Sequence, residues 1–197
     1  MHSLPLRYPY ALIFWPVYYL AFIQEGKFLK ECKPKIGETG SQDRGSFRLI
    51  VIGIKIALVI ALICAEAIPS ACLRHGQLFY FYGGLICLVA GALLRRHCFM
   101  MLGDHFKFLV TVVLNRPIIE QGAYKWIRHP SYLAGILMFL GVGLALTNWV
   151  SISVMLLIPV ALYGYRIRVE EQALLQSLGT PYREYINRTK RLIPFLF

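Results

Sequence analysis

Two short polar clusters flank a pair of apolar segments in the C-terminal half of the sequence. Residues 128–132, with the sequence RHPSY, precede the pair, and residues 166–171, with the sequence RIRVEE, follow it. If the apolar segments form a helical hairpin, both clusters lie at the same membrane face. Charged side chains beside hydrocarbon are costly and usually mark a functional site. These clusters are therefore the first candidates for ligand binding or catalysis.

The first cluster has the features of a helix start. Pro130 suits the first turn of a helix, because its missing N–H would have no partner there in any case. The backbone amides of Ser131, Tyr132 and Leu133 would then be free donors for an anion such as a carboxylate. His129 is either a structural donor that fixes the turn before Pro130 or a direct contact to a bound ligand.

The second cluster has helical spacing. Arg166 and Glu170 are four residues apart and therefore share one face of a helix that we expect to continue to a stop at Gly179 and Pro181. An ordinary juxtamembrane helix with an ion pair worth about 0.2–0.5 kcal/mol is the alternative interpretation. The sequence of this cluster alone does not distinguish the two.

The composition is that of an integral membrane protein. Apolar residues make up 57% of the 197 residues, and the mean hydropathy is +0.57. Several apolar runs approach the roughly 20 residues that cross a hydrocarbon layer of about 30 Å. The chain has room for roughly four to six such spans, which leaves no space for a separate soluble catalytic domain. Any chemistry must therefore be built from loops and helix ends.

We predict an all-α fold with about five transmembrane helices. The last two form a tight hairpin around Thr147, Asn148 and Trp149. The first and fourth are short for full crossings, so tilt or partial insertion is expected. The predicted spans are residues 10–23, 49–72, 78–94, 133–146 and 150–165.

Glycines in the third predicted span indicate close helix packing. Gly83, Gly84 and Gly91 lie within this span, where small residues allow the backbones of neighbouring helices to approach. We therefore expect a tightly packed neighbour along this segment.

The distribution of Lys and Arg predicts the orientation in the membrane. Residues 24–48, residues 95–128 and the chain from Arg166 onward each carry six of them. Arg7 and Arg74 fall in the opposite loops, and Lys55 lies within a span. The positive-inside rule then places the N-terminus outside and the C-terminus in the cytoplasm, as a multi-pass protein. Attraction to anionic membrane lipids explains the net charge of +11, so we predict no nucleic-acid partner.

The five cysteines give no sign of a disulfide framework or a metal site. Their number is odd, no CxxC spacing occurs, and most lie in or near apolar segments. No His/Cys group has the spacing of a zinc site, and we predict no metal. We interpret them as packing residues, and they are Cys32, Cys64, Cys72, Cys87 and Cys98.

An ordered set of motifs over roughly residues 100–197, about half of the chain, resembles one protein family. It resembles the isoprenylcysteine carboxyl methyltransferases and the wider group of small membrane methyltransferases that includes phospholipid N-methyltransferases. The motifs are Gly122-x-Tyr124-x-x-x-Arg128-His129-Pro130-x-Tyr132, then Arg166-x-x-x-Glu170-Glu171, Gly179-x-x-Tyr182-x-x-Tyr185 and Arg191-Leu192-Ile193-Pro194.

The resemblance implies methyl transfer from S-adenosylmethionine, with S-adenosylhomocysteine as product, at the cytoplasmic face. The cofactor pocket would be formed by the loop before the fourth helix and by the C-terminal helix. Arg166 would be catalytic, near the substrate carboxylate and the transferred methyl group. The residues that would bind the cofactor are Arg116, Pro117, Ile118, Ile119, Tyr124, His129, Pro130, Ser131, Tyr132 and Glu170.

The same resemblance divides the chain into two parts. Residues 95–197 would be the methyltransferase core, with the cofactor loop, the helical hairpin 133–165 and the C-terminal helix. Residues 1–94 would hold three spans and a cytoplasmic loop, and would shape a lipid entrance. The acceptor would be a lipophilic or lipidated molecule, and an isoprenylcysteine carboxylate fits the family best.

Other functions stay open at this level. A phospholipid amine is the alternative acceptor, and it would need a base such as Glu170, Glu171 or His129 to remove a proton. A membrane reductase with a nicotinamide cofactor and a non-catalytic lipid-binding protein are the alternatives of other classes. Binding of labelled cofactor would separate these cases.

Overall fold

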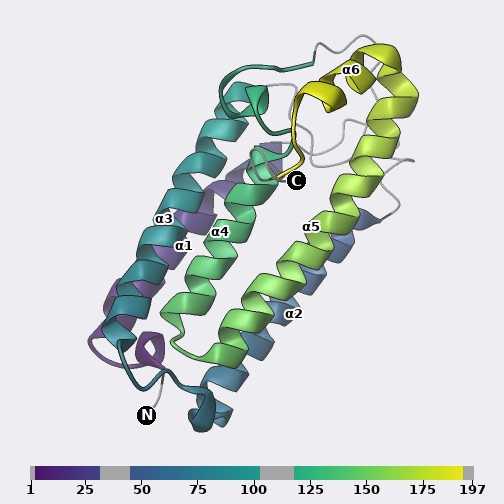
Figure 1. The fold of residues 1–197 in the computed structure, drawn as a ribbon. Coiled ribbons are helices and arrows are strands. Elements are labelled where there is room, and N and C mark those ends of the chain that lie inside the picture. The colour runs from purple at the N-terminus through teal and green to yellow at the C-terminus, as the bar shows by residue number, and fades with distance from the viewer. Residues whose placement is uncertain (1–2, 32–44, 103–117, 193–197) are drawn as a thin grey trace.

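The computed structural model of the protein describes residues 3–31, 45–102 and 118–192 (Figure 1). Within these ranges the regular secondary structure is helical, and two isolated β-bridges join Cys72 to Asn148 and Ile127 to Lys190. The predicted all-helical class is confirmed. The helices are η1 (Leu4–Leu6), α1 (Tyr10–Glu31), α2 (Ser46–Ala67), η2 (Pro69–Ala71), α3 (Gln77–Leu102), η4 (Gly122–Lys125), α4 (Pro130–Ala145), α5 (Trp149–Leu178) and α6 (Thr180–Arg188).

Each of the five predicted apolar segments corresponds to one long helix. Among the described residues, α2, α3 and α5 are long and apolar enough to cross a membrane, while α4 and the apolar part of α1 are shorter. The protein is thus a multi-pass integral membrane protein, and the predicted short first and fourth segments are found.

Several predicted boundaries were wrong. The second segment was expected to reach Cys72, but α2 ends at Ala67, because a residue before a proline is disfavoured in the helical region and Pro69 follows Ile68. The third segment was expected to end at Leu94, but α3 continues to Leu102. Its buried face continues through Arg95, which packs inward instead of beginning a loop.

The five long helices pack around one core. α4 packs between α3 and α5, α2 packs on α5, and α1 packs on α3 (Figure 1). Buried residues from all five helices belong to a single apolar cluster, which includes Phe14, Ala61, Phe81, Met138 and Met155. The predicted site residues on α4 and α5 are therefore held by one continuous set of packed helices.

Two of the three predicted glycine contacts hold α3 against α4. A Cβ on Gly84 would lie 2.5 Å from the backbone nitrogen of Ala145, and one on Gly91 would lie 2.8 Å from the carbonyl oxygen of Ala134. Neither position has room for a side chain. The prediction for Gly83 was wrong, since a Cβ there would meet nothing within 4 Å.

The predicted hairpin turn between α4 and α5 is confirmed. Thr147 adopts a φ of 51°, and the side chain of Asn148 accepts hydrogen bonds from the amides of Val150 (3.0 Å) and Ser151 (3.1 Å). The Asn148 amide also donates to the carbonyl of Ile68 at 3.1 Å, which ties the turn to the end of α2. With the turn fixed at this end, the start of α4 and the second half of α5 meet at the other.

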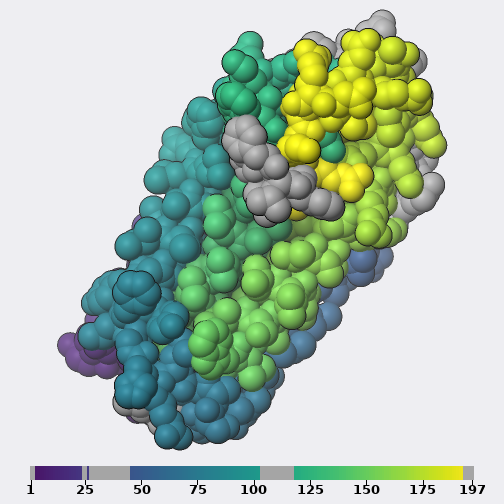
Figure 2. Space-filling view, in the orientation of Figure 1, coloured from purple at the N-terminus to yellow at the C-terminus, as the bar shows by residue number. Residues whose placement is uncertain are grey.

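The polar end of the molecule gathers the start of α4, the second half of α5, α6 and η4 (Figure 1). At about 1.5 Å per residue, the 30 residues of α5 span about 45 Å, well beyond a hydrocarbon core of about 30 Å. The predicted stop is confirmed, because α5 ends at Leu178, Gly179 follows with a φ of 61°, and α6 begins at Thr180. Figure 2 shows the C-terminal residues in yellow packed against the green residues that precede α4.

Candidate functional site

One hydroxyl group joins the two predicted polar clusters. The hydroxyl of Tyr132, in the first turn of α4, donates to Oε2 of Glu170 at 2.7 Å. Nε of Arg166 donates to the same hydroxyl at 3.3 Å. Tyr132 therefore contacts both residues that were predicted to share one helix face. The predicted convergence of the two clusters at one end of the hairpin is confirmed.

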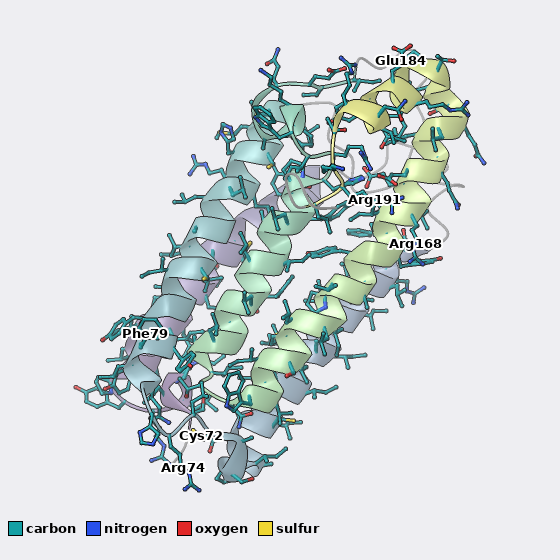
Figure 3. All side chains as sticks on the ribbon, viewed as in Figure 1. Cys72, Arg74, Phe79, Arg168, Glu184 and Arg191 are labelled. Atoms are coloured by element: carbon teal, nitrogen blue, oxygen red, sulfur yellow. The ribbon has the colours of Figure 1, made fainter. Side chains whose placement is uncertain are left out.

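Arg166 is buried and has a further partner from a distant helix. Arg166 is 3% exposed, and its Nη1 donates to Oγ of Ser46 at 2.5 Å. Ser46 is the first residue of α2 and is fully buried. Arg168, two residues further on, points away from the packed helices and is exposed (Figure 3). Three helices, α2, α4 and α5, thus meet at the Arg166 guanidinium.

The neighbouring carboxylate, Glu171, has a different set of partners. Its Oε1 accepts from Nε of Arg128 at 2.9 Å and lies 3.3 Å from Nε2 of His129. Its Oε2 accepts from Nε of Arg191 at 3.0 Å, and Arg191 lies beside α5 (Figure 3). The side chains of Arg128 and Glu171 are each 7% exposed. Two guanidinium groups therefore stabilise a buried carboxylate.

Arg128 extends this network to the C-terminal segment. Its Nη1 donates to the carbonyl of Ile186 at 3.0 Å and also to the carbonyl of Thr189. The amide of Arg128 donates to the carbonyl of Lys190 at 2.7 Å, and the amide of His129 donates to that of Arg191 at 3.0 Å. Residues 186–191 are thereby fastened to the start of α4. We call Arg128, His129, Glu171 and Arg191 the clamp.

Tyr124 contributes a buried hydroxyl that has no hydrogen-bond partner among the described residues. It lies in η4 and is 6% exposed. Cys98, Ser131 and Glu170 are near enough to affect the pKa of its phenol. Burial raises the pKa of this phenol well above its usual value. An orphaned buried polar atom is uncommon, and a bound ligand is one common explanation.

Tyr185 fixes Tyr124 from the other side. Its hydroxyl donates to the backbone carbonyl of Tyr124 at 2.7 Å, and burial raises the pKa of Tyr185 to about 12. The backbone of η4 is thus held by α6, while the Tyr124 hydroxyl itself is left for another partner.

The helix start of α4 differs from the prediction in one respect. Pro130 is the first residue of α4, as expected. The amides of Tyr132 and Leu133, predicted to be free donors, both bond to the carbonyl of His129, at 3.1 and 3.2 Å. The prediction was wrong because the first turn closes on the His129 carbonyl, so these amides do not face a ligand.

The remaining predicted residues are placed as follows. Arg116 and Pro117 lie outside the described residues. Ile118 and Ile119 are half-buried. Pro130 and Ser131 are buried in the first turn of α4. The fold therefore brings Tyr124, His129, Tyr132, Arg166 and Glu170 into one region.

Sequence reasoning missed Arg95 as part of this region. Arg95 is 8% exposed, and its Nη1 donates to the carbonyl of Ser131 at 2.6 Å. It also lies 5.0 Å from the centre of the Phe99 ring. Its spacing from Leu88, Gly91 and Phe99 is helical, so extending the third span past Leu94 would have put it on the buried face.

The arrangement suits a ligand that carries charges of both signs. A carboxylate and a guanidinium lie on either side of one phenol, with an orphaned hydroxyl in η4. No group of three His, Cys, Asp or Glu side chains that could hold a metal occurs in the part of the chain that the structure describes. The carboxylate, the guanidinium and the phenol can orient an organic ligand and stabilise its charges.

Comparison with known proteins shows similarity to one family. The model of the isoprenylcysteine carboxyl methyltransferase family matches residues 84–176, which include Tyr132, Arg166 and both glutamates. The predicted resemblance to this family is confirmed. Protein-S-isoprenylcysteine O-methyltransferase of Saccharomyces cerevisiae is 30% identical over 115 residues, which are 57% of this chain and 48% of the yeast protein. Protein-S-isoprenylcysteine O-methyltransferase A of Arabidopsis thaliana is 28% identical over 115 residues, 57% of this chain and 58% of the plant protein.

A solved structure agrees with the family match. The eukaryotic intramembrane Ras methyltransferase of the isoprenylcysteine carboxyl methyltransferase family superposes with a TM-score of 0.62 at 26% identity. The superposition covers 76% of this chain and 53% of that one. The chain thus spans about half the length of the methyltransferases it matches.

Proposed function

We propose that the protein is an integral membrane methyltransferase that transfers a methyl group from S-adenosylmethionine to the carboxylate of an isoprenylcysteine-like acceptor. The observation that carries the proposal is the Tyr132 hydroxyl between the Glu170 carboxylate and the Arg166 guanidinium. All three residues lie inside the segment that the family model matches. Matched relatives bear the name protein-S-isoprenylcysteine O-methyltransferase, which suggests the acceptor.

The residues present fit this cofactor. When bound, S-adenosylmethionine supplies an electrophilic methyl group on a sulfonium centre. Glu170 offers an acceptor for an amine or ribose hydroxyl, and the orphaned Tyr124 hydroxyl offers a further polar contact. The rings of His129 and Tyr132, 5.6 Å apart, provide π-faces that stabilise a nearby cation. Ser131 and Pro130 would line the same region, and Arg116, Pro117, Ile118 and Ile119 would complete it.

Arg166 is proposed to orient the acceptor. A carboxylate has a reference pKa of about 3.5 and is already ionised at neutral pH, so the protein need not remove a proton. A buried guanidinium can hold such a group with directed hydrogen bonds away from water. Aligning two bound reactants in this way lowers a barrier by up to about 7–11 kcal/mol in favourable cases. Arg166 is therefore assigned as the catalytic residue.

The proposed site lies at the cytoplasmic face. Support comes from the Lys and Arg residues, eighteen of which fall in three segments on one side of the predicted topology. In the proposed division, residues 95–197 carry cofactor and methyl transfer, and residues 1–94 shape the route of the lipid acceptor. A lipid tail can reach such a site laterally from the bilayer.

Titration of the purified protein with S-adenosylmethionine tests the assignment of cofactor and catalytic residues. We expect the wild-type protein to bind, Glu170→Ala to lose binding, and Arg166→Ala to bind but to lose transfer to a synthetic prenylcysteine. Arg168→Ala is the matched control, because this arginine is exposed on the same helix, and it should retain both properties. Full binding and turnover in both Glu170→Ala and Arg166→Ala would refute the proposal.

A further inference from the structure

A hydrogen bond joins the start of α2 to Arg166 on α5. Ser46 begins α2, 120 residues before Arg166, and its Oγ accepts the hydrogen bond from Arg166 Nη1 at 2.5 Å. Neither residue has more than 3% of its surface exposed. Ser46 lies outside residues 84–176, the segment that matches the family model. The N-terminal half of the chain thus reaches the proposed catalytic side chain directly.

The Ser46 hydroxyl meets Arg166 from the first position of α2. A serine at a helix start commonly accepts hydrogen bonds from the first free amides of that helix. Here the N-cap position is taken by Gly45, which has a φ of 69° and makes no side-chain cap. The left-handed turn at Gly45 starts α2 so that the following hydroxyl is directed at α5. The first side chain of α2 thus lies within hydrogen-bond distance of the guanidinium.

Two contacts on different nitrogens fix the orientation of the guanidinium plane. Nε bonds to the Tyr132 hydroxyl on α4, and Nη1 bonds to Ser46 on α2. Contacts on two nitrogens restrict the rotation of this planar group more than either contact does by itself. The plane matters because a guanidinium pairs with a carboxylate through directed, coplanar hydrogen bonds.

We propose that Ser46 is a positioning residue that sets the plane of the Arg166 guanidinium for recognition of the acceptor carboxylate. The inference rests on the function proposed above, since it assigns Ser46 a role in the same site. It predicts that loss of the Ser46 hydroxyl weakens discrimination of a carboxylate acceptor while cofactor binding is preserved.

A matched control is available in the same helix pair. Ser151 on α5 donates its hydroxyl to the carbonyl of Ala61 on α2 at 2.7 Å and is fully buried. Ser151→Ala removes a buried hydrogen bond between α2 and α5 at the end of the hairpin far from Arg166. Ser46→Thr keeps a hydroxyl at position 46 and serves as the conservative variant.

The experiment compares these variants with the wild-type protein in detergent. It measures the thermal midpoint, the affinity for S-adenosylmethionine, the kinetics with a synthetic prenylcysteine, and competition by that acid and by its carboxamide. For Ser46→Ala we expect kcat/KM and the acid-over-amide preference to fall about tenfold, as for loss of one hydrogen bond to a charged group. Cofactor affinity should stay within about twofold of wild type. Ser46→Thr should restore the preference, and Ser151→Ala should lower only the thermal midpoint.

The outcomes separate this inference from the proposed function. If the wild type transfers methyl groups and Ser46→Ala keeps the acid-over-amide preference, the positioning role is refuted while the function stands. If Ser151→Ala loses the preference to the same extent, the effect is general packing and the positioning role is again refuted. If the wild type neither binds S-adenosylmethionine nor transfers a methyl group, the proposed function fails and this inference fails with it. Should Ser46→Ala not be recovered folded, Ser46→Cys, a weaker acceptor of similar size, replaces it with the same expectations.

Discussion

Adjacent glutamates on α5 have contrasting surroundings. Glu171 is 5% exposed and accepts hydrogen bonds or ion pairs from Arg128, His129 and Arg191. Glu170 is half-buried and accepts from the hydroxyl of Tyr132. One carboxylate is surrounded by cations of the protein, and the other borders the proposed site. The same residue type, one position apart, therefore has two different sets of partners.

Helix geometry explains the contrast. Successive residues of an α-helix point about 100° apart, so Glu170 and Glu171 face different neighbours. Glu171 faces the loop before α4 and the C-terminal segment, and the clamp holds both in place. Glu170 faces Tyr132 and, through it, Arg166. We expect the clamp to stabilise the fold and the region around Glu170 to bind the ligand.

The largest expected effect comes from breaking the clamp. Glu171→Ala leaves the Arg128 guanidinium, 7% exposed, without its carboxylate, and removing one partner of a buried ion pair typically costs about 3–5 kcal/mol. We expect a large fall in the thermal midpoint, measured on the purified protein in detergent. Glu170→Ala is the matched control and should unfold close to the wild-type temperature.

The opposite pattern would overturn the comparison. If Glu170→Ala were the destabilised variant and Glu171→Ala unfolded like the wild type, the assignment of the two carboxylates would be reversed. Equal destabilisation by both would mean that neither is reserved for a ligand.

Two neighbouring glycines on α3 allow stability to be altered away from the polar end of the molecule. A Cβ at Gly84 meets the backbone of α4 at 2.5 Å, and overpacking of this kind typically costs about 1–3 kcal/mol. Gly84→Ala should therefore lower the thermal midpoint without changing the S-adenosylmethionine affinity of the folded fraction. Gly83→Ala, where a Cβ meets nothing within 4 Å, is the control and should match the wild type. A change of affinity in Gly84→Ala would show that the contact of α3 with α4 also shapes the ligand site.

The smallest expected effect separates two tyrosines in contact. Tyr185→Phe removes the hydrogen bond to the Tyr124 carbonyl and should cost about 1 kcal/mol of stability. Tyr124→Phe removes a hydroxyl without a described partner, so stability should be unchanged or slightly higher. Its S-adenosylmethionine affinity should fall about fivefold, the equivalent of about 1 kcal/mol. Unchanged affinity in Tyr124→Phe would remove this hydroxyl from the proposed site.

Local signals made the hairpin and the meeting of the two clusters predictable. Asn148 caps α5, Pro130 opens α4 and Gly179 ends α5, each for a reason that residue type and spacing reveal. Once α4 and α5 form an antiparallel pair, the residues at the start of α4 must meet the residues in the second half of α5. The contact of Tyr132 with Glu170 follows from these short-range features.

Contacts that depend on long-range packing were not predictable. The bond of Ser46 to Arg166 requires the relative height of α2 and α5, which the sequence of neither helix specifies. The inward direction of Arg95 depends on how far α3 continues before its loop begins.

Identification of the methylated product tests the central claim most directly. Purified wild-type protein is incubated with methyl-labelled S-adenosylmethionine, a synthetic prenylcysteine and phospholipid vesicles, and the label is traced to its chemical form. The account predicts a base-labile methyl ester on the prenylcysteine, with none formed by Arg166→Ala. Label found in a base-stable N-methyl group of the phospholipid, or in no product at all, would contradict it.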